Sequence, residues 1–137
     1  NRAVPIERDG ESFLLAGVND HEAARFSGND DEAPNVGAAI AERETDQEVV
    51  LLAHQPREIF DAADNDVGLM LSGHTHGGQL WPWMHLVGLQ QPYISGLHQH
   101  GERTQIYVSE GTGFWGPPMR VGSTAEITRI RLQSERG

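Results

Sequence analysis

Ser72-Gly73-His74-Thr75-His76-Gly77-Gly78-Gln79 decides the fold, together with a second histidine stretch at Leu51-Leu52-Ala53-His54-Gln55-Pro56. A short apolar run precedes each stretch, at residues 49–52 and 67–71. Short apolar runs bounded by turn residues predict strands buried in an α/β sheet. Because parallel strands of such a sheet end at the same edge, the three imidazoles are expected to lie near one another. The sequence therefore predicts a metal site at the edge of a sheet.

The remaining patterns predict a mixed β-sheet with flanking helices, and hence the α/β class. Strands are expected at residues 3–6, 12–18, 49–53, 67–72, 93–98, 103–109 and 124–132, and helices at residues 36–44 and 57–65. A turn at residues 8–10 is expected to join the first two strands, and the strands at 93–98 and 103–109 are expected to form a hairpin. The run at 12–18 is nearly all apolar, which is typical of a strand buried on both faces. Residues 19–35 are polar and are expected to form a mobile loop, whereas 81–91 and 111–120 are expected to be irregular.

The composition limits the classes of protein and of site. The 137 residues suffice for one compact domain, and 20 acidic against 10 basic side chains give a net charge of −10, which argues against nucleic acid as a partner. The absence of cysteine leaves only nitrogen and oxygen ligands for a metal. There is no membrane-spanning run and no signal-peptide pattern, and the chain begins without methionine. We therefore interpret it as a fragment of a longer protein.

Four other histidines and four aromatic residues allow more than one interpretation. His21, His98 and His100 lie in polar, turn-like stretches and are expected at the surface, and His85 is expected to pack within an aromatic segment. The aromatic side chains could form a small satellite core or a wall beside the metal site, and if exposed they would suit a partner or a lipid surface. They are Trp81, Trp83, Phe114 and Trp115.

The histidine motifs resemble those of the calcineurin-like metallophosphoesterases. The resemblance runs from residues 14–20 through the two histidine stretches to residues 106–113. Within the family, the sequence is similar to the bacterial branch whose members are often tied to the membrane by an N-terminal segment. The resemblance implies two divalent metal ions, manganese, iron or zinc, bridged by an aspartate and a hydroxide. It also implies that His54 and His74 ligate one ion and His76 the other. Residues Gly77, Gly78 and Gln79 are predicted to bind substrate.

Three motifs of that family are absent from this sequence. They are an Asp-x-His motif, a Gly-Asp motif with the bridging aspartate, and a Gly-Asn-His-Asp/Glu motif whose histidine assists the leaving group. Residues 1–137 are therefore expected to be the C-terminal part of a metallophosphoesterase domain, half of a two-sheet sandwich, without a catalytic general acid. Neutral imidazoles alone do not offset the charge of two dications, so a binuclear site needs carboxylate ligands as well. No other segment of this sequence is expected to supply those carboxylates.

The function predicted for the longer protein is hydrolysis of phosphomonoesters or phosphodiesters by a metal-activated hydroxide. The fragment is expected to bind one metal ion or none and to be inactive alone. Two alternatives stay open: a non-catalytic interaction module that retains the fold, and a hydrolase using a single zinc held by the three histidines. Arg120 is expected either to contact a phosphate or to form a surface salt bridge.

Partners and location follow from the same interpretation. Half of a sandwich would expose an apolar sheet face, so we expect a homodimer or another partner to cover it. The fragment is expected to be soluble and the longer protein to be membrane-associated or exported. Any membrane association is expected to come from an N-terminal segment outside these residues.

Overall fold

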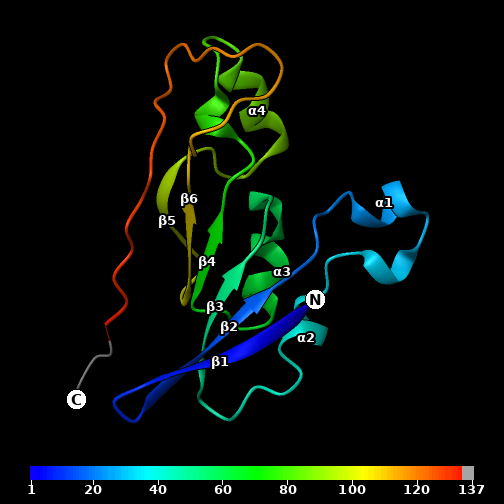
Figure 1. Ribbon diagram of the computed structural model, residues 1–137, viewed down its shortest axis with the longest axis vertical. Helices are drawn as coiled ribbons and strands as arrows, with labels where there is room; N and C mark the ends of the chain where they lie inside the picture. Colours follow the sequence, from blue (N-terminus) through cyan, green and yellow to red (C-terminus); the bar gives the residue numbers. More distant parts are fainter. Residues whose placement is uncertain (134–137) are drawn as a thin grey trace.

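The computed structural model describes residues 1–133 and places six strands in one sheet (Figure 1). They are β1 (Arg2–Arg8), β2 (Glu11–Gly17), β3 (Glu48–Leu52), β4 (Leu69–Ser72), β5 (Gly96–His100) and β6 (Thr104–Val108). Their order across the sheet is β1-β2-β3-β4-β6-β5. The central strands β2, β3, β4 and β6 are parallel, and β1 and β5 pair antiparallel at the two edges. The predicted mixed sheet of the α/β class is confirmed.

Short helices connect and flank the strands. They are α1 (Ala23–Ser27), α2 (Val36–Ala39), α3 (Ile59–Asp64) and α4 (Met84–Gln90), with single 3₁₀ turns η1 (Asp30–Glu32), η2 (Pro56–Glu58) and η3 (His76–Gly78). None of the helices in residues 1–133 is long and apolar enough to cross a membrane.

One face of the sheet carries the hydrophobic core. Helices α2 and α3 lie against it, and Val36 of α2 and Ile59 of α3 are fully buried there. The strand residues beneath them are Leu14, Ala16, Val49, Leu51, Met70, Ile106 and Val108. Alternation along each strand puts these side chains on one side, because successive residues of a strand point to opposite faces.

Within residues 1–133, no helix packs on the opposite face of the sheet. The strand register sets Leu52, Leu71, Tyr107 and Leu97 side by side across four strands. Leu52 is 44% exposed and Leu97 is 60% exposed. The prediction that β2 is buried on both faces is therefore wrong, because its second side chain row, Phe13 and Leu15, is only half-buried.

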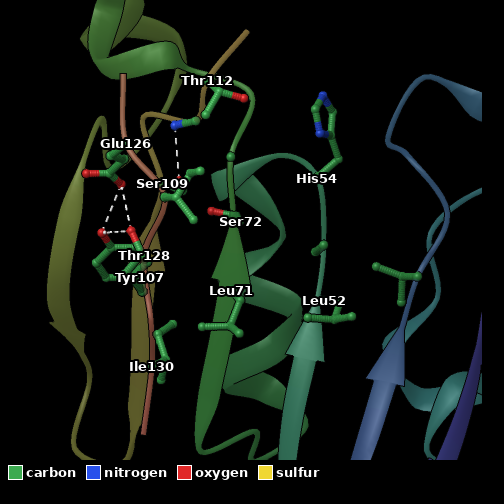
Figure 2. A pocket seen from close by; sticks show the side chains of 15 residues that line it. Leu52, His54, Leu71, Ser72, Tyr107, Ser109, Thr112, Glu126, Thr128 and Ile130 are labelled. Carbon is green, nitrogen blue, oxygen red and sulfur yellow. Dashed lines mark hydrogen bonds between the residues drawn. The ribbon is translucent and has the colours of Figure 1, made fainter. Parts of the chain in front are cut away.

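The C-terminal segment, residues 124–133, runs along part of this open face (Figure 2). The hydroxyl of Tyr107 donates to Glu126 Oε1 at 2.9 Å and lies 2.9 Å from Thr128 Oγ1. A cavity of about 650 Å³ lies between the segment and the sheet. The strand predicted at 124–132 does not form in the described part of the chain, and its Ile127 is 92% exposed. An alternating sequence makes a strand only where a neighbouring strand offers a hydrogen-bond ladder. Within the described residues this segment has one backbone hydrogen bond, from the Glu126 amide to the Gly111 carbonyl at 3.0 Å, and its other contacts involve side chains.

Two further segments differ from the sequence predictions. The loop expected at 19–35 contains α1 and η1, and η1 begins where Asn29 Oδ1 accepts the Asp31 amide at 3.1 Å. The sequence of α1 carries no apolar periodicity, because the helix has no buried face, and the helix was therefore not predicted. The irregular segment expected at 81–91 contains α4, which follows a turn at Pro82.

Other boundaries moved by a few residues. The helix predicted at 36–44 ends at Ala39, because the acidic residues that follow disfavour the negative end of a helix. The helix at 57–65 is confirmed as η2 followed by α3. The hairpin predicted from 93–98 and 103–109 is confirmed, with strands that begin at Gly96 and Thr104.

Candidate metal centre

His54 and His74 follow the ends of β3 and β4. These two strands are parallel neighbours in the sheet (Figure 1). The backbone pairing continues past both strands. The Ala53 amide donates to the Leu71 carbonyl at 3.1 Å, and the Gly73 amide donates to the His54 carbonyl at 3.1 Å. This continuation fixes the two loops side by side. As a result, Nε2 of His54 lies 3.2 Å from Nδ1 of His74, and the ring centres are 4.9 Å apart.

The two ring nitrogens are within hydrogen-bond distance of each other, and the same closeness would let both imidazoles bind one divalent ion through their nitrogen lone pairs. His74 also has a positive φ of 70°, a conformation that costs a non-glycine residue free energy and is concentrated at functional sites.

His76 does not join the pair directly. Its Nδ1 lies 3.1 Å from Arg120 Nη2, and its carbonyl accepts a hydrogen bond from the same guanidinium at 3.2 Å. Among residues 1–133 there is no group of three histidines, aspartates or glutamates placed to hold one ion. The structure thus brings two of the three predicted ligands together and directs the third to a neighbouring position.

The electrostatics of the two loops favour neutral imidazoles. Burial lowers the pKa of His74 below its ordinary value and the neighbouring His54 lowers it further, whereas Asp20 raises it. Burial also lowers the pKa of His76, and the Arg120 guanidinium adds to that effect. A neutral imidazole has the free nitrogen lone pair that binds a metal, so these shifts suit metal ligation.

Asp20 supplies a carboxylate that the sequence reasoning missed. Its Oδ2 lies 3.9 Å from Nε2 of His54, and its Oδ1 accepts hydrogen bonds from the Glu22 amide at 2.8 Å and from Gln55 Nε2 at 3.3 Å. Asp20 therefore approaches His54, but within residues 1–133 it forms no group of three that could hold an ion, so the expectation that no other segment supplies the carboxylates the site needs stays a prediction. The available signal was the position of Asp20 just after β2, the strand paired with β3.

Arg120 ties the glycine-rich loop at 111–120 to the loop at 73–79 that carries His74 and His76, which we call the histidine loop. Its guanidinium donates to the carbonyls of His76, Glu110, Gly111, Gly113 and Thr124 at 2.6 to 3.2 Å. Within the described residues its partners are carbonyls, a hydroxyl and an imidazole, so the salt-bridge alternative is not realised. A contact between Arg120 and phosphate stays a prediction.

The three residues predicted to bind substrate are buried members of the histidine loop. Gly77 and Gly78 both have positive φ, 63° and 81°. The side chain of Gln79 is fully buried; its Nε2 donates to the Trp115 carbonyl at 2.7 Å and its Oε1 accepts from the Trp115 amide at 2.8 Å. Gln79 thus fastens the loop at 111–120, and a role of these residues in binding substrate stays a prediction.

The remaining histidines lie apart from the pair. His21 contacts Glu58 at 2.9 Å. His85 is exposed on α4, so the expectation that it packs within an aromatic segment is wrong. His98 and His100 were expected in turns at the surface. They lie instead on β5, half-buried, with His98 stacked on Tyr93 and His100 Nδ1 3.0 Å from the Tyr93 hydroxyl.

Comparison with known proteins identifies relatives that are named as metallophosphoesterases or as carrying a metallophosphoesterase domain. An uncharacterized metallophosphoesterase of Helicobacter pylori strain J99 is 43% identical over 119 residues, 86% of this chain and 31% of that protein. An uncharacterized metallophosphoesterase of Campylobacter jejuni is 44% identical over 106 residues, 76% of this chain and 28% of that protein. A zebrafish (Danio rerio) protein named transmembrane protein with metallophosphoesterase domain is 41% identical over 131 residues, 93% of this chain and 29% of that protein.

These matches confirm the resemblance on which the sequence interpretation rests. The chain spans less than one third of the length of these three relatives. No family model matches the sequence, and no solved structure matches it.

Proposed function

Because this chain is a homologue of the metallophosphoesterases over a part of their length, we propose that it supplies the histidine ligands of a binuclear metal centre that hydrolyses phosphoesters. The observation that carries the proposal is the pair of imidazole nitrogens 3.2 Å apart at the ends of two parallel strands. His54 and His74 would hold one divalent ion, manganese, iron or zinc, and His76 would hold the second.

The chain's own residues account for one part of such a site. Two bound metals would supply a hydroxide nucleophile near neutral pH and stabilise the oxygens of the phosphoester. Asp20 places negative charge beside His54, and Arg120 holds the loop that carries His76. The bridging aspartate and the leaving-group histidine of the family have no counterpart in this sequence. The isolated chain is therefore proposed to bind metal weakly and to be inactive.

Metal titration of the 137-residue chain tests this proposal. Isothermal titration calorimetry with Mn²⁺ and with Zn²⁺ is expected to show binding at one site that His54→Ala and His74→Ala each abolish. The matched control is His85→Ala, which removes an exposed histidine of α4 and is expected to leave binding unchanged. Binding that survives loss of both His54 and His74 would overturn the assignment.

A phosphodiesterase assay separates the alternatives. With bis(4-nitrophenyl) phosphate and Mn²⁺ or Zn²⁺, the chain alone is expected to give no turnover. Turnover with one bound zinc that His76→Ala abolishes would establish the single-zinc hydrolase instead. A folded chain that binds neither metal would favour a non-catalytic interaction module.

We also propose that a second copy of the chain covers the open sheet face. The supporting observation is the exposed apolar row that includes Leu52 and Leu97. Figure 2 shows Leu52 and Leu71 of this row among the residues that line the cavity. A clean monomer by light scattering at high concentration would refute the dimer.

The longer protein is proposed to be membrane-associated or exported. Two vertebrate relatives, from Danio rerio and Bos taurus, are named transmembrane proteins with a metallophosphoesterase domain, and they are 41% and 42% identical to this chain. Membrane fractionation of the full-length protein tests this placement, and recovery solely in the cytosolic fraction would contradict it.

A further inference from the structure

Six exposed apolar side chains gather at the end of the molecule that carries α4. They are Trp81, Trp83, Leu89, Phe114, Trp115 and Met119, between 40% and 82% exposed, and we call them the crown. Figure 1 shows α4 and the loop near residue 115 at the same end, beyond the edge of the sheet where β4 and β6 end. The crown therefore projects from the body of the domain.

Hydrogen bonds hold the two segments of the crown together. The Trp81 amide donates to the Val121 carbonyl at 2.7 Å, and the Val121 amide donates to the Gln79 carbonyl at 2.8 Å. The buried Gln79 side chain also binds both backbone groups of Trp115. Residues about 35 positions apart in the sequence thus form one fixed surface, so the exposure of the crown is a property of the fold and not of a free chain end.

The crown lacks charge in a strongly charged chain. Residues 67–101 contain no aspartate, glutamate, lysine or arginine, and residues 111–121 contain only Arg120. The guanidinium of Arg120 is engaged with backbone carbonyls. All 20 acidic residues of the chain therefore lie outside both crown segments.

The combination of exposed tryptophans and a lack of charged side chains in the crown segments favours a lipid bilayer over a protein as the partner of the crown. Tryptophan has an apolar ring body and one N–H donor, and it is enriched where hydrocarbon meets headgroups. Protein interfaces surround an apolar centre with a polar rim, whereas the crown segments carry no acidic side chain of their own. The charged residues Arg57, Glu58 and Asp61 line a hollow with Leu89, at one margin of the crown. The net charge of −10 opposes anionic lipid. We propose that the crown docks on the interfacial region of a zwitterionic lipid bilayer.

The chain carries its own probe for this docking. Its three tryptophans are Trp81, Trp83 and Trp115, and all of them belong to the crown. Titration of the 137-residue chain with phosphatidylcholine vesicles is expected to shift tryptophan emission to shorter wavelength and to make the protein float with the vesicles. Phosphatidylcholine brominated in its acyl chains is expected to quench that emission. Vesicles of equal parts phosphatidylcholine and phosphatidylglycerol are expected to bind more weakly, and added salt is expected to restore binding.

A matched pair of variants locates the docking surface. The triple variant Trp83→Ser, Leu89→Ser and Phe114→Ser is expected to lower the vesicle partition coefficient by at least about tenfold, because three apolar side chains no longer enter the bilayer. The control is Phe26→Ser, which removes an apolar side chain that is 86% exposed on α1, outside both the crown and the open sheet face. The control is expected to bind as the unaltered chain does.

Several results would overturn the proposal. One is the absence of both flotation and quenching with the unaltered chain, which requires no variant to fold. Another is loss of binding in the control with retention in the triple variant. A third is self-association of the unaltered chain that the triple variant abolishes, since that would make a second copy the occupant. None of these readouts depends on metal, so failure here is distinguishable from failure of the proposed metal centre.

Discussion

Replacement of Gly78 by alanine tests whether the histidine loop is packed against α4. Gly78 has φ of 81°, and a Cβ built there would lie 2.5 Å from Cα of Met84 and closer still to its Cβ. Met84 is the first residue of α4, so the overlap is with backbone as well as side chain. The helix and the loop can therefore accommodate the methyl group only by moving apart.

The expected cost has two parts. A positive φ costs an alanine about 0.5–1.5 kcal/mol after allowance for the lost freedom of the unfolded chain. Overpacking adds about 1–3 kcal/mol. For a domain of this size the overpacking alone corresponds to a Tm lower by about 3–10 °C.

Gly10 provides the matched control. Its φ of 84° is nearly that of Gly78, and a Cβ built there meets no atom within 4 Å. Gly10→Ala therefore carries the backbone cost without the overlap. Thermal unfolding of both variants by circular dichroism isolates the packing contribution as their difference. Equal stability of the two variants, within about 0.5 kcal/mol, would refute the close packing of Gly78 on Met84.

Three further predictions concern the site and its supporting loop. Gln79→Leu keeps the side-chain volume but removes the bonds to Trp115, so the free energy of unfolding is expected to fall by about 2–3 kcal/mol in urea titrations. Asp20→Asn removes the charge beside His54 and is expected to weaken Mn²⁺ binding by about tenfold in calorimetry. Because the folded chain holds the pKa of His74 below its ordinary 6.5, protons bind the unfolded chain more readily. Stability is therefore expected to fall as the pH drops below about 6.5, and His74→Asn is expected to reduce that dependence.

Each of these predictions has an outcome that would contradict it. A Gln79→Leu variant as stable as the unaltered chain would mean that the loop at 111–120 is not fastened there. Unchanged Mn²⁺ affinity in Asp20→Asn would separate the carboxylate from the site. Stability that is flat across this pH range, or equally steep in His74→Asn, would exclude His74 as the group that responds.

Much of the fold was legible in local patterns. The apolar runs before His54 and His74 predicted the parallel strands β3 and β4, and a buried strand needs little more than its own composition to be recognised. The turn at Asp9-Gly10 and the hairpin of β5 and β6 followed from turn residues between apolar segments. The histidine motif itself fixed the resemblance that the relatives confirm.

The errors share one physical cause. Alternation at residues 124–132 indicated a strand, but a strand needs a partner ladder, and in the described residues the segment makes only scattered contacts such as Glu126 with Tyr107. Helix α4 is apolar without a polar stripe, so its period gave no helical signal. In each case the outcome depended on which neighbours were present.

The sequence by itself determined the class of the fold and which residues carry nitrogen lone pairs for a metal, because both follow from short-range pattern and side-chain chemistry. Only the tertiary structure decided which of them meet. The parallel pairing of β3 and β4 brought His54 against His74 and left His76 with Arg120, and β2 carried Asp20 to the same edge. The crown likewise arose from two distant segments joined through Gln79. Contacts between residues far apart depend on chain register and packing, which no local pattern encodes.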